Sequence, residues 1–332
     1  MSNKRIDELK AAVRQAIKDQ EVKHIDIGEL QAEDVDVKKL LKPSKETRQE
    51  YWGKALTSLA ILLIVVLVAS IIGFVGYHGL ATFFENHVNF IKFLTTSVWD
   101  PSNPNKLGSL AMIVTSFLVT VLAALIATPF AIAVAIFMTE YSSKKSANFL
   151  QTVIELLVGI PSVVYGFLGL TVVVPVIRSL FGGTGFGILA GTIVLFVMVL
   201  PTITSLTVDA LRAVPKHFRN ASKALGATDW QTISRVVLKV ATPRILTAII
   251  FGMARAFGEA LAIQMVIGNA VLMPTSLISP ASTLTSQITT QIGNTVMGTL
   301  PNNALWSLAL LLLAMSLFFN ILVRFIGKRG AK

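Results

Sequence analysis

Two charged side chains lie inside an apolar run of the sequence. The stretch RAFGEALAIQMVIGN, residues 255 to 269, places Arg255 and Glu259 in a run that begins near Ile245. The planar guanidinium of arginine suits bidentate contacts with oxyanions, whereas an ionised carboxylate only accepts hydrogen bonds. An unpaired arginine at the centre of a bilayer costs about 2.5 to 3.5 kcal/mol, so such charges face protein or water. Two interpretations follow: a site that handles an anion, or a buried ion pair that fixes helix register.

A helix through this run predicts that the two charges, four residues apart, lie on adjacent turns of one face. Small residues form a column on each side of that face: Gly252, Ala256 and Ala260 on one, and Ala254, Gly258 and Ala262 on the other. Such columns let membrane helices approach closely. The charged face is therefore expected to point into a packed bundle.

The composition is that of an integral membrane protein. Of 332 residues, 53% are hydrophobic and 14% are charged, and the mean hydropathy of +0.69 lies outside the usual range of soluble domains. Six apolar segments reach the roughly 20 residues that a helical span needs, near residues 56–77, 110–138, 153–177, 188–208, 245–267 and 304–326. The second carries Pro129, where we expect it to be tilted or broken. In a soluble chain, the net charge of +11 would suggest binding to nucleic acid. In a membrane protein, positively charged loops beside the bilayer account for it better.

Basic residues are concentrated in alternate connecting segments. Lys and Arg total 29 in the chain, and most lie in segments 1–54, 139–152, 209–244 and 324–332. Because positively charged loops stay in the cytoplasm, both termini are predicted to be cytoplasmic in a multi-pass protein of the cell membrane. Residues 1–54 are interpreted as a cytoplasmic segment and residues 55–332 as the transmembrane domain. Within the first segment, apolar residues at helical spacing indicate an amphipathic helix; they are Ile6, Leu9, Val13 and Ile17. This helix is either solvated with one face against protein or docked on the membrane surface.

Enzyme chemistry finds little support. The chain has no cysteine and no GxxxxGK[ST] motif, so we predict no thiol chemistry, no P-loop for ATP, no cofactor and no metal. The GGTGFG stretch at residues 182–187 follows no strand and is interpreted as a tight external turn. Segment 268–303 has no charged residue and three prolines, and we expect a polar external loop with one short helix. Asp209, at a predicted span exit, is as consistent with an interfacial charge as with a functional one.

The longest internal cytoplasmic loop, at residues 209–244, contains two helical stretches on either side of Gly226. That glycine permits a turn with positive φ. The neighbouring helices carry small side chains at Ala221, Ala224 and Ala227, which makes the hairpin narrow. A small-residue helix hairpin of this kind is well shaped to enter a groove of another protein, although a simple connector has the same pattern.

The stretch NASKALGATDWQTISRVVLKVATP resembles the coupling loop of ABC importer permeases. Gly226 falls on the glycine of that pattern, while Asn220, Ser222 and Lys239 depart from it. The blocks IELLVGIPSVVYGFLG, AIAVAIFMTEY and RAFGEALAIQMVIGN resemble the C-type permease (PstC) of phosphate-specific importers, over roughly residues 50 to 326.

This resemblance implies an all-α membrane protein with six transmembrane helices and the type I ABC importer permease (MetI-like) fold. It implies a second homologous permease subunit, a cytoplasmic ATPase dimer and an extracytoplasmic phosphate-binding protein as partners. The chain itself is then non-catalytic, and Arg255 and Glu259 carry the translocation of inorganic phosphate. The residues implied in ATPase docking are Asn220, Ala221, Ser222, Ala224, Leu225 and Gly226.

Two alternatives stay open. One is a permease for another oxyanion, such as molybdate or sulfate, with the same coupling loop. The other is a secondary transporter or channel that works without ATP, which paired broken spans or inverted repeats would favour.

Overall fold

The computed structural model describes residues 45–329, with side chains for residues 49–321 and Phe325. The predicted amphipathic helix near Ile6 to Ile17 lies outside the described residues. The chain divides into two units, Met1–Val68 and Ala69–Lys332. The described part of the first unit is the N-terminal stretch of α3 (Lys45–Phe84), and the boundary predicted between residues 54 and 55 falls inside this helix.

Within residues 45–329 the regular structure is helical, which confirms the predicted fold class. The α-helices after α3 are α4 (Phe90–Thr95), α5 (Leu110–Ile136), α6 (Lys144–Gly159), α7 (Ser162–Leu168), α8 (Val174–Phe181), α9 (Ile188–Arg212), α10 (Lys216–Ala224), α11 (Asp229–Thr232), α12 (Leu238–Phe257), α13 (Leu261–Gln264), α14 (Leu284–Gln291) and α15 (Leu300–Arg329). Short 3-10 turns are η1 (Pro104–Lys106) and η5 (Ile292–Asn294), and π-helical turns are η2 (Phe137–Tyr141), η3 (Gly169–Val173) and η4 (Ile233–Val237).

The described residues contain 6 helices that are long and apolar enough to cross a membrane, as predicted. They are Gln49–Phe84, Leu110–Tyr141, Ser162–Phe181, Ile188–Arg212, Asp229–Phe257 and Leu300–Ile321. Of the tilt or break expected at Pro129, the break does not occur, because α5 continues through this residue. The third span begins later than predicted, since Pro161 has no N–H to donate and holds Ile160 in an extended conformation (φ −67, ψ 129).

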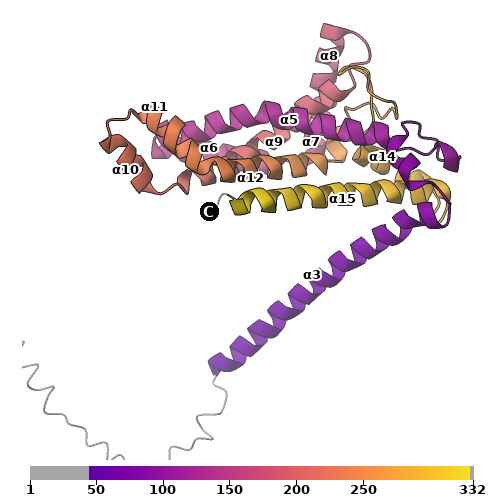
Figure 1. The fold of residues 1–332 in the computed structure, drawn as a ribbon, viewed down its shortest axis with the longest axis horizontal. Helices are drawn as coiled ribbons and strands as arrows, with labels where there is room; N and C mark the ends of the chain where they lie inside the picture. Colours follow the sequence, from indigo (N-terminus) through magenta and orange to yellow (C-terminus); the bar gives the residue numbers. More distant parts are fainter. Residues whose placement is uncertain (1–44, 330–332) are drawn as a thin grey trace, which may run out of the picture. The chain divides into compact units, whose positions relative to one another are not determined.

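In the second unit, α5, α9, α12 and α15 lie side by side (Figure 1). The helices α10 and α11 lie at one end of this bundle, and α14 lies at the other. The final turns of α3 also pack against α15, where the Ser307 hydroxyl donates a hydrogen bond to the carbonyl oxygen of Gly79 at 2.7 Å. The predicted turn at residues 182–187 is confirmed, because four of its glycines have positive φ, at Gly182, Gly183, Gly185 and Gly187.

Candidate functional site

Helix α12 ends between Arg255 and Glu259. It stops at Phe257, and a new helix, α13, begins at Leu261, so Arg255 and Glu259 do not share a helix face. The predicted continuous span is therefore wrong at this point. Gly258 has low helix propensity, and the Glu259 carbonyl oxygen accepts a hydrogen bond from the Thr285 hydroxyl at 2.8 Å. That partner, 26 residues further along the chain, satisfies a backbone group that continuing the helix would have used.

Arg255 lies in the last turn of α12 and is partly buried. Its Nη1 atom donates a 2.6 Å hydrogen bond to Oγ1 of Thr202, a buried residue of α9. The C-terminal end of a helix carries partial negative charge, which stabilises a cation within the last turn. The helix break therefore supplies a reason why this guanidinium is tolerated inside the bundle, and within residues 49–321 its other N–H groups make no side-chain hydrogen bond.

Glu259 uses its carboxylate differently from the sequence prediction. Its Oε1 atom accepts a hydrogen bond from the backbone N–H of Ala262, in the first turn of α13, at 3.1 Å. Among the described side chains no ion pair joins Arg255 to Glu259. The predicted buried ion pair is absent from this conformation because the break turns the two side chains toward different partners.

A small polar cavity lies beside Glu259, with a volume of about 10 Å³. This is close to the space that one water molecule needs. Its lining includes hydroxyl groups from α5 and from the N-terminal end of α14, at Ser116, Thr120, Thr283 and Thr285. The hydroxyl groups and the carboxylate together form a polar region inside an otherwise apolar bundle.

Segment 268–303 supplies part of that polar region. The predicted short helix is confirmed as α14, but its first turn is buried in the bundle and does not lie in an external loop. The N–H of Leu284 donates to the Ser116 hydroxyl of α5 at 2.9 Å. The sequence of this segment is dense in Ser and Thr and has no charged residue. This composition fits burial among helices as well as an external loop, because hydroxyl groups can be buried when they are hydrogen-bonded, whereas charges are costly to bury.

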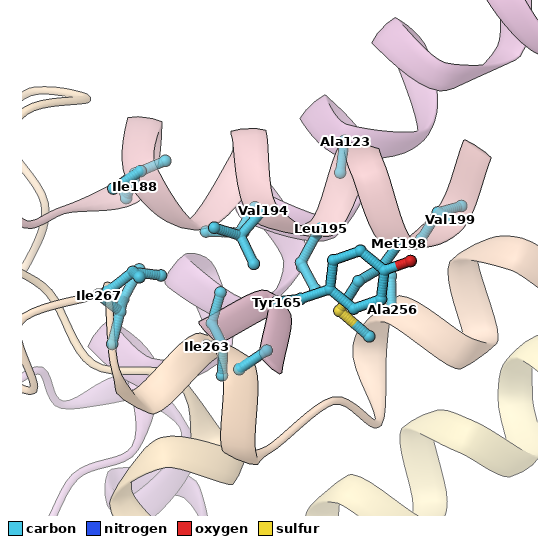
Figure 2. Packing of buried hydrophobic residues seen from close by; sticks show 14 of the residues in the cluster. Ala123, Tyr165, Ile188, Val194, Leu195, Met198, Val199, Ala256, Ile263 and Ile267 are labelled. Atoms are coloured by element: carbon cyan, nitrogen blue, oxygen red, sulfur yellow. The ribbon is translucent and has the colours of Figure 1, made fainter. Parts of the chain in front are cut away.

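Small residues allow the elements of the site to approach closely, as predicted. A Cβ on Gly252 would lie 2.6 Å from Cγ1 of Ile203, so the backbone of α12 at Gly252 lies directly against a side chain of α9. A Cβ on Gly166 of α7 would lie 2.8 Å from Cα of Ala262. Figure 2 shows side chains from both sides of the break, Ala256 and Ile263, in one cluster with residues of α9.

We expect Gly252→Ala to destabilise the protein by about 1 to 3 kcal/mol, because the added methyl group overpacks a stiff, fully buried isoleucine. The measurement is thermal unfolding of the purified chain in detergent. Gly76→Ala is the matched control, since Gly76 is helical with nothing within 4 Å of an added Cβ. Equal melting temperatures for the two variants would contradict the close contact of α9 and α12.

The predicted helix hairpin around Gly226 is confirmed. Helix α10 ends at Ala224, Gly226 has φ +80, and Thr228 caps α11 with its side chain. Of the residues implied in docking, Ser222 is partly buried and its hydroxyl lies 3.0 Å from that of Thr232, so it holds the hairpin together. The others are exposed: Asn220, Ala221, Ala224, Leu225 and Gly226.

Two ion pairs hold this hairpin, and neither was predicted from the sequence. Arg219 of α10 forms a short ion pair with Glu140, which lies in the π-helical turn at the end of α5. Arg219 also donates to the carbonyl oxygen of Leu211 in α9 at 3.1 Å. Lys223 pairs with Asp229 across the turn at 2.7 Å. Glu140 stands just after a long apolar span, and this isolated acid was the available signal.

The family profile described as "Binding-protein-dependent transport system inner membrane component" matches residues 127–332, more than half of the chain. The chain belongs to this family. It is thus a multi-pass membrane protein and a permease subunit of the ABC importer class, which disfavours the alternative of a transporter that works without ATP.

Relatives of this permease support the same assignment. A "Probable ABC transporter permease protein YqgH" from Bacillus subtilis is 50% identical over 90% of this chain and 97% of its own length. A "Phosphate transport system permease protein PstC" from Mesorhizobium japonicum is 34% identical over 71% of this chain and 78% of its own. A chain of a bacterial ABC transporter for import of the polysaccharide alginate has the same fold, with TM-score 0.59 at 16% identity over 87% of this chain and 99% of its own.

Proposed function

We propose that this permease provides half of the translocation pathway of an ATP-driven importer of inorganic phosphate. The observation that carries the proposal is Arg255, a guanidinium inside the bundle whose one hydrogen-bond partner among the described side chains is the neutral hydroxyl of Thr202. A neutral partner leaves the positive charge uncompensated, so an arriving oxyanion replaces it with a gain in electrostatic energy. Relatives named as phosphate permeases support phosphate among the oxyanions.

We infer the partners of the proposed complex from the family together with the proposed substrate. They are a second homologous permease, a cytoplasmic ATPase dimer and an extracytoplasmic phosphate-binding protein, in a cell membrane with both termini of this chain in the cytoplasm. The domain division is a cytoplasmic segment at residues 1–54 and a transmembrane domain at 55–332. In this arrangement ATP hydrolysis belongs to the partner chain, and this subunit is non-catalytic.

Energetics supports a separate motor. Moving an anion inward against an interior-negative potential costs about 2.3 kcal/mol per charge per 100 mV, so a passive pore would release phosphate. Closure of the ATPase dimer would move the exposed hairpin at Leu225 and Gly226. The Arg219–Glu140 pair connects that hairpin to α5, and η4 continues directly from the hairpin into α12, the helix that carries Arg255.

The test is the anion dependence of ATP hydrolysis by the complete complex in liposomes, with its binding protein present. We expect phosphate to stimulate hydrolysis at least threefold, and sulfate or molybdate to leave it near the basal rate. Stimulation by one of those anions and not by phosphate would reassign the substrate. Anion uptake by the permease pair without any ATPase would overturn the proposed class of transporter.

A further inference from the structure

A groove with mainly apolar walls lies along the faces of α9 and α12 that carry Thr202 and Arg255. Its volume is about 250 Å³, enough for several water molecules. The groove is lined by Leu206, Asp209, Ala210, Arg244, Thr247, Ala248 and Phe251. It therefore combines an arginine, a carboxylate and a hydroxyl group with apolar walls.

Helix geometry places this groove in line with Arg255. Arg244 and Arg255 are 11 residues apart in α12, which is three turns and about 16 Å along one helix face. On α9, Thr202 and Asp209 are seven residues apart and also share a face. The two helices thus present one continuous strip, with Arg255 near one end and Arg244 toward α10 and α11.

The charged groups of the groove are not neutralised by each other. Arg244 and Asp209 are exposed, and neither forms an ion pair or a side-chain hydrogen bond within residues 49–321. An arginine that only marked the membrane surface would lie equally well on any face of α12. This one lies three turns from Arg255 and lines a cavity together with an acid.

We propose that Arg244 is a second oxyanion-binding residue, which receives the anion after it leaves Arg255 and before it enters the cytoplasm. The inference rests on the proposed function of phosphate import. Guanidinium donors bind the oxyanion, and the carboxylate of Asp209 accepts a hydrogen bond from a protonated phosphate. Because Asp209 also repels the negative charge, the anion is held weakly and is released.

The chain has no cysteine, which permits a charge-rescue experiment in the complete complex. We expect Arg244→Cys to lower phosphate uptake at least fivefold. Modification with aminoethyl methanethiosulfonate, which attaches a cationic group, should restore at least half of the wild-type rate. Sulfonatoethyl methanethiosulfonate, which attaches an anionic group, should restore none. Restoration by charge alone distinguishes anion binding from a packing role.

Lys239→Cys is the matched control, because Lys239 is an exposed cation of the same helix, five residues away and on another face. The wild-type complex treated with both reagents controls for cysteines in the partner chains. Uptake by Arg244→Cys within twofold of the Lys239→Cys rate, or equal rescue by both reagents, would overturn the inference. Arg255→Cys, measured in parallel, separates the two proposals: if it transports normally, the proposed function fails as well.

Discussion

Arg255→Gln is expected to lower phosphate uptake by the reconstituted complex roughly ten- to hundredfold. The reason is the loss of charge-assisted hydrogen bonds, which contribute about 1.5 to 3 kcal/mol each. Glutamine can still reach a hydroxyl such as that of Thr202, so the helices should assemble normally while the anion loses its cation. The uptake rate of Arg255→Lys should lie between those of the wild type and Arg255→Gln, because lysine keeps the charge but lacks the bidentate guanidinium. The measurement is the initial rate of radiolabelled phosphate uptake at equal amounts of assembled complex.

Glu259→Gln is the informative companion variant. The amide oxygen of glutamine can accept the hydrogen bond from Ala262 that the carboxylate accepts now, so we expect a smaller loss of uptake than for Arg255→Gln. If Arg255→Lys and Glu259→Gln both transport at nearly the wild-type rate, neither residue contacts the anion directly. Thr202→Val tests the resting partner of Arg255 separately, and should leave most of the uptake intact because the guanidinium remains.

Leu225→Asp is expected to weaken association of the ATPase with the permease at least tenfold. Leu225 is 89% exposed at the tip of the hairpin and thus offers its whole side chain to a partner. Burial of a leucine side chain contributes about 1.5 to 3 kcal/mol, which corresponds to roughly a ten- to hundredfold change in affinity. A carboxylate at this position also has to be desolvated on docking. The measurement is the amount of ATPase that co-purifies with a tagged permease at rising salt and detergent.

The control for this prediction is Val296→Asp, which introduces the same charge at another exposed apolar position. Val296 is 73% exposed and lies between η5 and α15, away from the hairpin. It should leave ATPase co-purification unchanged. Equal retention of ATPase by the two variants would show that docking does not use the tip of the hairpin. If only Leu225→Asp loses the ATPase, phosphate should also fail to stimulate hydrolysis in that variant.

The sequence by itself determined the class of the protein, the number of spans and the position of the hairpin. These features depend on local quantities: the length of apolar runs, the breakers between them and a glycine at a turn. Gly226 was predicted to adopt positive φ because no neighbour is needed to make that conformation favourable for glycine, and its φ of +80 agrees. The small residues around Arg255 likewise predicted close helix packing from composition alone.

Only the tertiary structure decided how the charged residues are arranged. Helix α12 ends before Glu259 because Thr285, from a segment read as an external loop, hydrogen-bonds its carbonyl oxygen. Arg255 contacts Thr202 and not Glu259 because α9 packs closely against α12, where the Ile203 side chain lies directly against Gly252. The hydrogen-bond partner of Glu259 lies 26 positions away in the chain, and that of Arg255 lies 53 positions away. Helical periodicity predicts contacts only between residues three or four positions apart. The choice between an unbroken span and two short helices was therefore set by long-range contacts.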